Sequence, residues 1–449
     1  MSAEPVVGII GGGVAGLSAA YRLLQKGFRV QLFEAGPELG GLVRTFRVGG
    51  EPIECFYHHL FTSDTAAASL IDELGLARRL VWRESRVGLF YGGRAYPFVT
   101  PLDLLRFKPV GPLDRLRLGL MGIRLRRVKD GSRFENITAS DWIRRFAGRR
   151  NLEVVWGPLL RGKFGDYADE VVMAWLWNKV RLRFLSRRRG PAQREVLGYL
   201  LGSFGGYIEA LVSRIRELGG VLETGRPVAG IAAEGGRLVL RVAGRDEPHT
   251  FDAVIATVAS GIFARLAPSL PEGYARKLDA VPYQDALCLI LALKQPLTPF
   301  YWLSINDRSL PFLAVIEHTN LIEPERYGGQ HIVYLSNYLD KTSPLLRMDI
   351  EELSRLYLPH LRTINPEFDE SWIADRWLFH GPDAQPVFTV GSGSRIPEQQ
   401  TPIPGLYLAN MSQIYPHDRG QNYSILLGEN VANTVAADLA RERAPVYHV

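Results

Sequence analysis

The chain has 449 residues, of which 46% are hydrophobic and 22% charged, and its formal net charge is +6 at pH 7. This length and composition predict two or three folded domains and exclude a disordered chain. The two cysteines, Cys55 and Cys288, lie far apart, and no run of 18 apolar residues occurs. We therefore expect no disulfide framework, no metal site and no membrane-spanning helix.

An apolar strand over residues 6–10 leads into a glycine-rich turn and a helix-period stretch, and a second strand over 30–33 ends at Glu34. The turn has the spacing G-x-G-x-x-G, formed by Gly11, Gly13 and Gly16. Glycines there allow a tight turn, close approach of a pyrophosphate and close helix packing, while the helix N-terminus favours the diphosphate. Because a carboxylate at the Glu34 position accepts adenosine ribose hydroxyls, the unit predicts FAD or NAD and disfavours NADP.

The next stretch, residues 34–46, contains a glycine pair followed by a threonine. With the glycine turn, it resembles the N-terminal fingerprint of the flavin amine oxidase superfamily, which includes amine oxidases, protoporphyrinogen oxidases and phytoene-desaturase-like enzymes. The resemblance implies FAD, because a second glycine pair suits a ligand that continues into a ribityl chain and a flat ring. The usual arginine after the pair is Leu42 here, and Arg44 follows. The implied cofactor residues of this end are Gly11, Gly13, Ala15, Gly16, Glu34, Ala35, Gly40, Gly41, Leu42 and Arg44.

Residues 57–61 (YHHLF) resemble the histidine loop that UDP-galactopyranose mutases place against the isoalloxazine ring. Side chains alternate along an extended strand, so His58 and His59 are not both expected to face one pocket. We expect at most one to act, either as a proton relay or as a hydrogen-bond donor to flavin or substrate. A structural loop histidine is the alternative interpretation.

Residues 86–199 predict the first part of a substrate domain, mostly helical. Within it, 156–177 resembles a protoporphyrinogen oxidase segment, and its Met173, Trp175 and Trp177 either line a substrate cavity or fill the core. Arginine-rich runs at 115–129 and 179–189 fit a solvated face, a membrane surface or an anionic substrate, whereas nucleic acid is not expected. On a helical wheel, the first run carries arginines on opposite sides, unlike a simple interfacial helix.

Residues 200–261 return to the nucleotide fold, and residues 262–375 predict the sheet of the substrate domain. The resemblance assigns the main chain of Val228 to adenine and places Thr257 at the end of a strand under the cofactor. In monoamine oxidases, a lysine six residues before a K-x-P sequence holds a water at flavin N5. Counting back from Lys294 gives Cys288, which argues against simple amine substrates and makes Cys288 a candidate catalytic residue. Polar clusters at 317–320 and 334–338 either bind substrate or cap strands.

The closing stretch resembles the superfamily's C-terminal fingerprint, which brings a strand and a helix N-terminus to the ribityl chain and flavin O2. Free N–H groups at that helix start stabilise the negative locus of reduced flavin. The usual Gly-Asp is replaced by Asn410-Met411, so Asn410, Ser412 or a water molecule is expected to take the ribityl contact. No cysteine lies there, so noncovalent FAD is expected. The cofactor residues implied in this stretch are Asn410, Met411, Gln421, Asn422 and Tyr423.

The expected fold is α/β, with a discontinuous Rossmann-like FAD domain (1–85, 200–261 and 376–449) and a mixed α+β substrate domain (86–199 and 262–375). The expected function is hydride transfer from a large apolar or lipid-linked substrate, such as a tetrapyrrole or isoprenoid, to flavin N5. Two alternatives stay open: a redox-neutral flavin reaction and a noncatalytic FAD-binding scaffold. We expect a cytoplasmic, unsecreted protein, with peripheral membrane contact through the arginine-rich helices as an option, and the sequence leaves the oligomeric state open.

Overall fold

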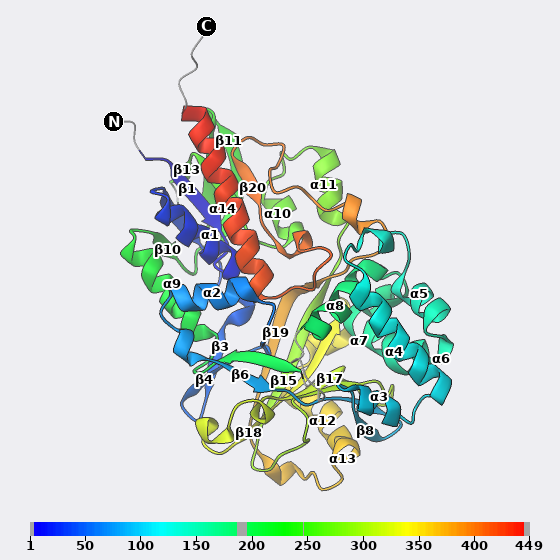
Figure 1. The fold of residues 1–449 in the computed structure, drawn as a ribbon. Helices are drawn as coiled ribbons and strands as arrows, with labels where there is room; N and C mark the ends of the chain where they lie inside the picture. The colour runs from blue at the N-terminus through cyan, green and yellow to red at the C-terminus, as the bar shows by residue number, and fades with distance from the viewer. Residues whose placement is uncertain (1–3, 186–194, 246, 444–449) are drawn as a thin grey trace.

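The computed structural model describes residues 4–185, 195–245 and 247–443, and Figure 1 shows their arrangement. A five-stranded parallel sheet, ordered β10-β2-β1-β14-β20, forms the centre of the upper half. Each of the three predicted FAD-domain segments contributes strands to it. These strands are β1 (Val6–Ile10), β2 (Arg29–Phe33), β10 (Val221–Glu223), β14 (Ala253–Ala256) and β20 (Leu406–Leu408).

Helices α1 (Val14–Gln25), α9 (Gly205–Glu217) and α14 (Gln421–Arg443) cover one face of this sheet, and α1 packs against both others. The contact between α1 and α14 is close, because a Cβ at Gly428 would lie 2.3 Å from the carbonyl oxygen of Ala15. An antiparallel sheet of β11 (Val228–Glu234), β12 (Arg237–Val242) and β13 (His249–Phe251) lies on the other side, and its apolar side chains pack against Phe33. Helices α10 (Ser260–Leu266) and α11 (Glu272–Asp279) follow it.

A seven-stranded mixed sheet, ordered β19-β15-β18-β17-β16-β7-β8, forms the lower half. Strand β15, second in this order, is buried at every residue because both faces are covered: Cys288 and Ile290 face the core shared with the FAD-binding half, and Leu289 and Leu291 face a second core. The strands are β7 (Val87–Tyr91), β8 (Arg94–Pro97), β15 (Tyr283–Leu293), β16 (Trp302–Ile305), β17 (Ala314–Glu317), β18 (His331–Leu339) and β19 (Ile373–Pro386). Helices α12 (Ile350–Tyr357) and α13 (Leu361–Ile364) close the second core.

A helical lobe lies beside this sheet, on the right in Figure 1. Its core contains aromatic side chains such as Trp142, Phe164 and Trp175, all of them buried. The lobe consists of α3 (Pro101–Arg106), α4 (Pro112–Arg127), α5 (Ala139–Phe146), α6 (Arg149–Asn151), α7 (Gly157–Phe164) and α8 (Met173–Leu185). Among the helices described, none is both long and apolar enough to cross a bilayer.

Short elements join the two halves. The hairpin of β3 (Thr45–Val48) and β4 (Glu51–Glu54) follows the glycine pair, and β5 (Leu60–Phe61), β9 (Val196–Leu200) and β6 (Leu80–Glu84) form a small antiparallel sheet. Helix α2 (Thr65–Glu73) packs on α14. The predicted fold class, an α/β FAD domain with a mixed α+β second domain, is confirmed.

Candidate active site

The glycine turn after β1 has the geometry that its spacing predicts. Gly11 adopts a φ of 104°, a conformation that favours glycine, and a Cβ at Gly16 would lie 2.0 Å from the carbonyl oxygen of Gly11. By contrast, a Cβ at Gly13 would meet no protein atom within 4 Å. Gly16 is therefore required by the fold itself, whereas the absence of a side chain at Gly13 leaves open space over the N-terminus of α1, where a diphosphate binds favourably.

Glu34 lies at the end of β2, beside the turn. Its Oε2 accepts a hydrogen bond of 2.7 Å from the amide of Gly12, and its Oε1 accepts one of 2.7 Å from the amide of Gly36. Each carboxylate oxygen has a further lone pair, so both can also accept a ribose hydroxyl. Main-chain hydrogen bonds from residues 225 and 226 to Gly36 and Glu34 bring the start of β11, where Val228 lies, alongside. Ala35 is exposed at this edge.

The glycine pair folds back on the turn. The amide of Gly40 donates to the carbonyl of Gly12 at 2.8 Å, and a Cβ at Gly41 would lie 3.2 Å from the Cα of Gly13. After the pair, Leu42 lines the cavity described below. Arg44 is exposed and donates to the carbonyl of His380 at 3.3 Å, so its guanidinium group contacts the substrate-side sheet.

The Thr257 side chain stabilises the glycine turn through hydrogen bonds. Its hydroxyl donates to the carbonyls of Ile10 and Gly11, at 3.0 and 3.1 Å. Ala15 contributes its main chain to the close contact with Gly428 of α14. The role of these two residues in this structure is therefore to hold the glycine turn and the N-terminus of α1, together called the phosphate cradle, in shape.

Asn410 does not point into the cavity. Its Nδ2 donates to the carbonyl of Val258 and to the hydroxyl of Ser260, and its Oδ1 accepts from the amide and hydroxyl of Ser412. Met411 follows in the same 3₁₀ turn and is not among the residues that line the cavity. A ribityl contact from the side chain of Asn410 or Ser412 would compete with these hydrogen bonds, because Asn410 caps the 3₁₀ turn and Ser412 donates to it.

The start of α14 lines the cavity with three side chains. Gln421 is buried, and neither its amide oxygen nor its amide nitrogen has a hydrogen-bond partner among the described residues. Asn422 accepts from the amide of Ala67 at 3.1 Å, and Tyr423 stacks on His417 with 4.3 Å between ring centroids. An unpaired buried amide costs free energy, and its donor and acceptor complement the N–H and C=O groups of a flavin pyrimidine edge. The residues present therefore fit a flavin.

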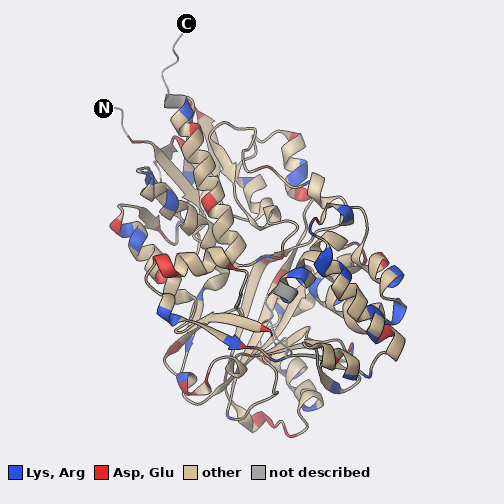
Figure 2. Cartoon of the chain, viewed as in Figure 1, with Lys and Arg blue, Asp and Glu red and all other residues tan. Residues whose placement is uncertain are grey.

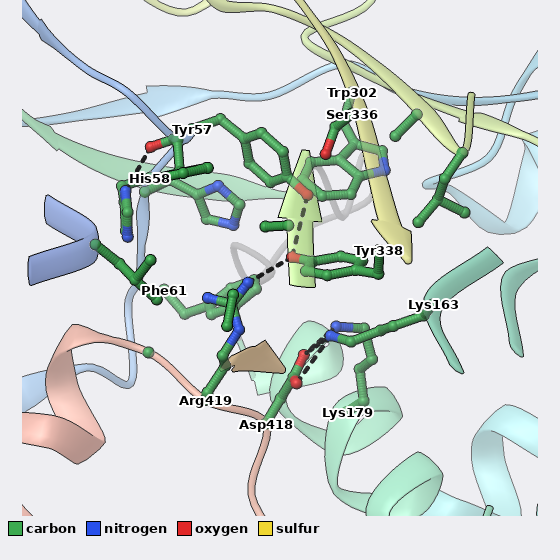
Figure 3. Close-up of a pocket in the computed structure, with 18 of the residues that line it drawn as sticks. Tyr57, His58, Phe61, Lys163, Lys179, Trp302, Ser336, Tyr338, Asp418 and Arg419 are labelled. Carbon is green, nitrogen blue, oxygen red and sulfur yellow. Dashed lines mark hydrogen bonds and ion pairs between the residues drawn. The ribbon is translucent and has the colours of Figure 1, made fainter. Parts of the chain in front are cut away.

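The cavity lies where the two halves of the molecule meet and has a volume of about 180 Å³. Figure 3 shows its aromatic wall, in which Tyr57 packs edge-on against Trp302 at 5.0 Å between centroids. The Tyr57 and Tyr338 hydroxyls are 3.4 Å apart, and Arg419 donates to the Tyr338 hydroxyl at 2.6 Å. Cys288 and Ser336 form its floor on the seven-stranded sheet.

His58 and His59 both line the cavity, so the expectation that only one of them faces it is wrong. The physical reason is that residues 55–59 form no strand, and strand alternation does not apply. Burial lowers the pKa of His58 to about 4 and that of His59 to about 3, so both are neutral near pH 7. His58 Nδ1 donates to the carbonyl of Phe56 at 2.6 Å, which leaves its Nε2 as a proton acceptor.

Cys288 lies at the position that the sequence count gives, on the floor of the cavity and 1% exposed. Burial raises the pKa of its thiol to about 12, so the sulfur stays protonated and is a poor nucleophile. Lys294 lies at the far end of β15, where its ammonium group donates to the carbonyl of Ser371. Lys294 therefore does not replace the missing lysine.

Sequence reasoning missed a cationic cluster on the opposite wall, drawn at the bottom of Figure 3. Asp418 accepts from Lys163 at 2.8 and 2.9 Å and from Lys179 at 2.5 Å. Burial opposes the ionisation of Asp418, yet the two ammonium groups hold its pKa well below the usual range; burial likewise lowers the pKa of Lys163. No local pattern marks these residues, since Lys163 and Asp418 are far apart in the chain.

The described lining of this cavity carries more positive than negative charge. Four side chains are cationic (Lys163, Lys179, Arg183 and Arg419), two are acidic (Asp64 and Asp418), and the histidines are neutral. Two cations are therefore left without a counterion in the cavity, although Arg183 lies 4.0 Å from Glu195 outside it. Buried charge without a counterion is costly, and a bound anion would remove that cost.

Other predicted candidates have structural roles. The core of the helical lobe contains Met173, Trp175 and Trp177, and none of them lines a described cavity. Of the two predicted roles, they therefore have the core role. The polar cluster at 317–320 caps loops: Glu317 accepts from the amides of Leu297 and Thr298. The cluster at 334–338 divides, because Ser336 and Tyr338 line the cavity and Asn337 does not.

A Rossmann-like cradle, a flavin-compatible helix start and an aromatic cavity between two halves define an FAD-dependent oxidoreductase class. The family model described as flavin containing amine oxidoreductase matches residues 14–435, so the chain belongs to that family. FAD is accordingly its cofactor, and the predicted family is confirmed.

Among curated proteins, coproporphyrinogen III oxidase of Propionibacterium freudenreichii is 28% identical over 174 residues, which is 36% of this chain and 32% of that protein. Protoporphyrinogen oxidase 2 of Arabidopsis thaliana is 24% identical over 183 residues, 38% of this chain and 36% of that protein. The matched segments thus span about a third of the length of these relatives.

Solved structures show the same fold over nearly the whole chain. A proposed protoporphyrinogen oxidase from Exiguobacterium sp. 255-15 has a TM-score of 0.78 and 19% identity, with 98% of this chain and 100% of that chain covered. Reduced UDP-galactopyranose mutase has a TM-score of 0.73 and 17% identity, with 96% of each chain covered. These likenesses concern the fold alone.

Proposed function

We propose that this protein oxidises a large, mainly apolar substrate that carries an anionic group, such as a tetrapyrrole or an isoprenoid acid. The observation that carries this proposal is that the cationic cavity shares wall residues with a second, apolar cavity of about 490 Å³. Both cavities are lined by Leu159, Lys179, Arg183, Ser304 and Asn306. A substrate that fills both would bury an apolar body and place its anion among the cations.

The second cavity suits an apolar body. Leu104, Leu118, Met121 and Trp156 line it, among other side chains of the helical lobe and β7. At the junction, the Asn306 amide donates to the carbonyls of Val154 and Val155, both at 2.8 Å, so it holds the wall rather than the ligand. The combined space falls in the size range of sites for organic ligands.

In the proposed reaction, the substrate loses a hydride from a C–H bond and a proton from the neighbouring atom, and a double bond forms between the two atoms. When bound, FAD would supply the acceptor for this hydride at its N5, and oxygen, a quinone or a nicotinamide would then take up the two electrons. The protein's own residues orient the substrate: Arg183 and Arg419, the two lining cations that are not bound to Asp418, hold the anionic group, and His58 accepts the proton at its free Nε2. The neutral, small side chain of Cys288 leaves space in the cavity above the seven-stranded sheet.

Simple amines are poor candidates for this cavity. A protonated amine would meet an excess of positive charge, and Asp418 is already paired with two lysines. The matched relatives named as coproporphyrinogen III oxidase and protoporphyrinogen oxidase support a tetrapyrrole as the first substrate to try.

The test is anaerobic mixing of the FAD-loaded protein with reduced porphyrins bearing carboxylates, their esters, desaturable isoprenoid acids and primary amines, with loss of oxidised-flavin absorbance as the readout. We expect bleaching by a carboxylated apolar compound, much slower bleaching by its ester and none by amines. Faster bleaching by amines would overturn the proposal, as would no bleaching by any compound, which favours the noncatalytic scaffold.

A redox-neutral reaction is the second candidate, because Tyr57, His58 and His59 all line the cavity. The same protein, prereduced and supplied with nucleotide sugars, separates the two candidates. Product formation without consumption of an oxidant would favour the redox-neutral reaction over the oxidation.

A further inference from the structure

Helices α3 and α4 present apolar side chains to solvent. Among the described residues, six of the thirteen exposed large hydrophobic side chains lie on these two helices, and their exposed fractions run from 49% to 65%. They are Leu102, Leu105, Leu113, Leu116, Leu120 and Ile123. Single exposed leucines are ordinary, but six exposed apolar side chains on two helices that contact each other are typical of an interaction site.

The pattern on α4 explains why the helix does not resemble an interfacial helix in sequence. Leu118 and Leu125 face the lobe and are buried, while the leucines at 113, 116 and 120 and Ile123 recur at spacings of three and four residues on the opposite side. The helix therefore has two apolar faces. Packing inside the lobe accounts for one of them, and nothing in the described chain covers the other.

Basic side chains border the exposed leucines, and Figure 2 shows Lys and Arg gathered over this lobe. An open hollow beside Leu120 and Ile123 is lined by four cations, Arg124, Arg127, Lys129 and Arg133. Its one acid, Asp130, is bound by the amide and hydroxyl of Ser132, at 2.9 and 2.6 Å. None of the four cations takes part in a salt bridge within the described residues.

We propose that the α3–α4 face, defined by these six apolar residues and four cations, docks on an anionic lipid bilayer. Leucines would enter the boundary of headgroups and acyl chains, and the basic hollow would hold lipid phosphates, as in interfacial helices. The charges favour a bilayer over a second copy of this chain. An interface between two identical faces would set arginines near arginines, whereas anionic lipid complements them.

The apolar cavity supports this orientation. Exposed Pro101, Ile123 and Arg126 line the 490 Å³ cavity, so it opens at the docking face. A docked protein would receive an apolar substrate directly from the bilayer. This access route rests on the proposed function, whereas docking itself does not.

The experiment is sedimentation of the full-length FAD-loaded protein with vesicles of phosphatidylcholine alone or of equal parts phosphatidylcholine and phosphatidylglycerol. We expect the protein to pellet with the anionic vesicles. The variant L113S/L116S/L120S/I123S should bind them about tenfold or more weakly, because the serines replace apolar side chains whose transfer from water into the bilayer favours binding. R124Q/R127Q/K129Q/R133Q should also lose binding, and binding of the unsubstituted protein should weaken as salt is added.

The matched control for the leucine variant is L218S/V221S/I262S/L356S, which removes four exposed apolar side chains elsewhere. It should bind vesicles like the unsubstituted protein. Circular dichroism and flavin content of every variant check folding, and they are independent of substrate turnover.

Three results would overturn the proposal. The unsubstituted protein would stay in the supernatant with both vesicle types, or the leucine variant would bind as well as the control. Alternatively, sedimentation equilibrium would show a dimer that the leucine substitutions dissociate, which assigns the face to a second copy. Lipid binding without turnover would overturn the proposed function and leave the docking intact.

Discussion

Asp418 is the residue on which the cationic wall depends. It is the shared acceptor of Lys163 and Lys179, and its side chain is 15% exposed. Removing one partner from a buried ionic group leaves the other charges unpaired, which costs far more than loss of a surface pair.

We therefore expect Asp418→Asn to lower the free energy of unfolding by about 3 kcal/mol, measured by urea denaturation. The control is Glu217→Gln, which breaks an exposed pair with Arg214 and should leave the free energy of unfolding nearly unchanged, because water screens that pair. Equal effects of the two substitutions on the free energy of unfolding would show that pairing of Asp418 with the two lysines does not stabilise the fold.

Glu54 gives a pH-dependent prediction. It is 1% exposed, accepts from the Tyr199 hydroxyl and the Phe204 amide, and has no cationic partner in its hydrogen bonds. Burial raises its pKa from 4.5 to about 7. The folded protein thus keeps this proton where the unfolded chain has lost it, so the stability contributed by Glu54 is full below about pH 4.5 and is lost as pH rises through about 7.

Glu54→Gln should remove this loss. We expect its melting temperature, relative to the unsubstituted protein, to be higher at about pH 8 than at about pH 5. The comparison cancels the opposite contribution of the buried neutral histidines, which both proteins share. A relative melting temperature that does not change with pH would contradict the assignment.

Single residues were the least predictable level from sequence. Gln421 was identified through its place in a fingerprint, yet its unpaired amide is visible only in three dimensions. Lys163, Lys179 and Asp418 meet because helices α7 and α8 pack against the segment before α14, and nothing local encodes that contact.

The glycine turn shows what an element encodes locally. Its spacing, preceding strand and following helix lie within one short stretch, so the sequence predicted its geometry closely. The histidine loop did not follow the strand rule, because residues 55–59 turn irregularly between β4 and β5. Periodicity arguments hold only where the backbone is regular.

Two glycines of the turn, Gly13 and Gly16, should respond differently to substitution by alanine. Gly13→Ala adds a Cβ into open space, so the unfolding free energy of the FAD-free protein should change by less than about 1 kcal/mol. FAD affinity, measured by fluorescence quenching, should fall about tenfold or more because the Cβ occupies the approach of the pyrophosphate. Gly16→Ala should instead destabilise the protein itself, since its Cβ would overlap the Gly11 carbonyl.

Gly273→Ala is the control for these variants. Its added Cβ also meets no atom within 4 Å, but it lies on α11, which carries none of the predicted FAD-binding residues. It should leave FAD affinity unchanged. Gly13→Ala protein that binds FAD normally would place the cofactor elsewhere.

At the scale of the whole molecule, the two-part architecture could be predicted through the family resemblance, because the strands of the FAD sheet lie in three separated fingerprint segments. How the cavities join could not be predicted, since their walls combine β7, α8 and β16, and the paired strands β7 and β16 are separated by about half of the chain. The sequence also did not reveal that α4 carries a second, uncovered apolar face. Burial of one face depends on neighbours that are distant in sequence.

The predicted FAD-binding residues come from both ends of the chain, so removal of FAD should lower the stability of the whole protein. At a free FAD concentration about a hundredfold above its Kd, binding should add about 2.7 kcal/mol to the free energy of unfolding. Thermal unfolding with and without added FAD measures this gain. A single transition that shifts upward is expected, and an unchanged melting temperature would contradict FAD binding to the folded state.

The close contact between α1 and α14 has a consequence for biosynthesis. The phosphate cradle emerges from the ribosome early, but β20 and the Gln421 end of α14 are translated after most of the chain. A nascent chain therefore exposes an unfinished nucleotide pocket throughout elongation, and it can retain its cofactor only once the last helix has docked beside the first.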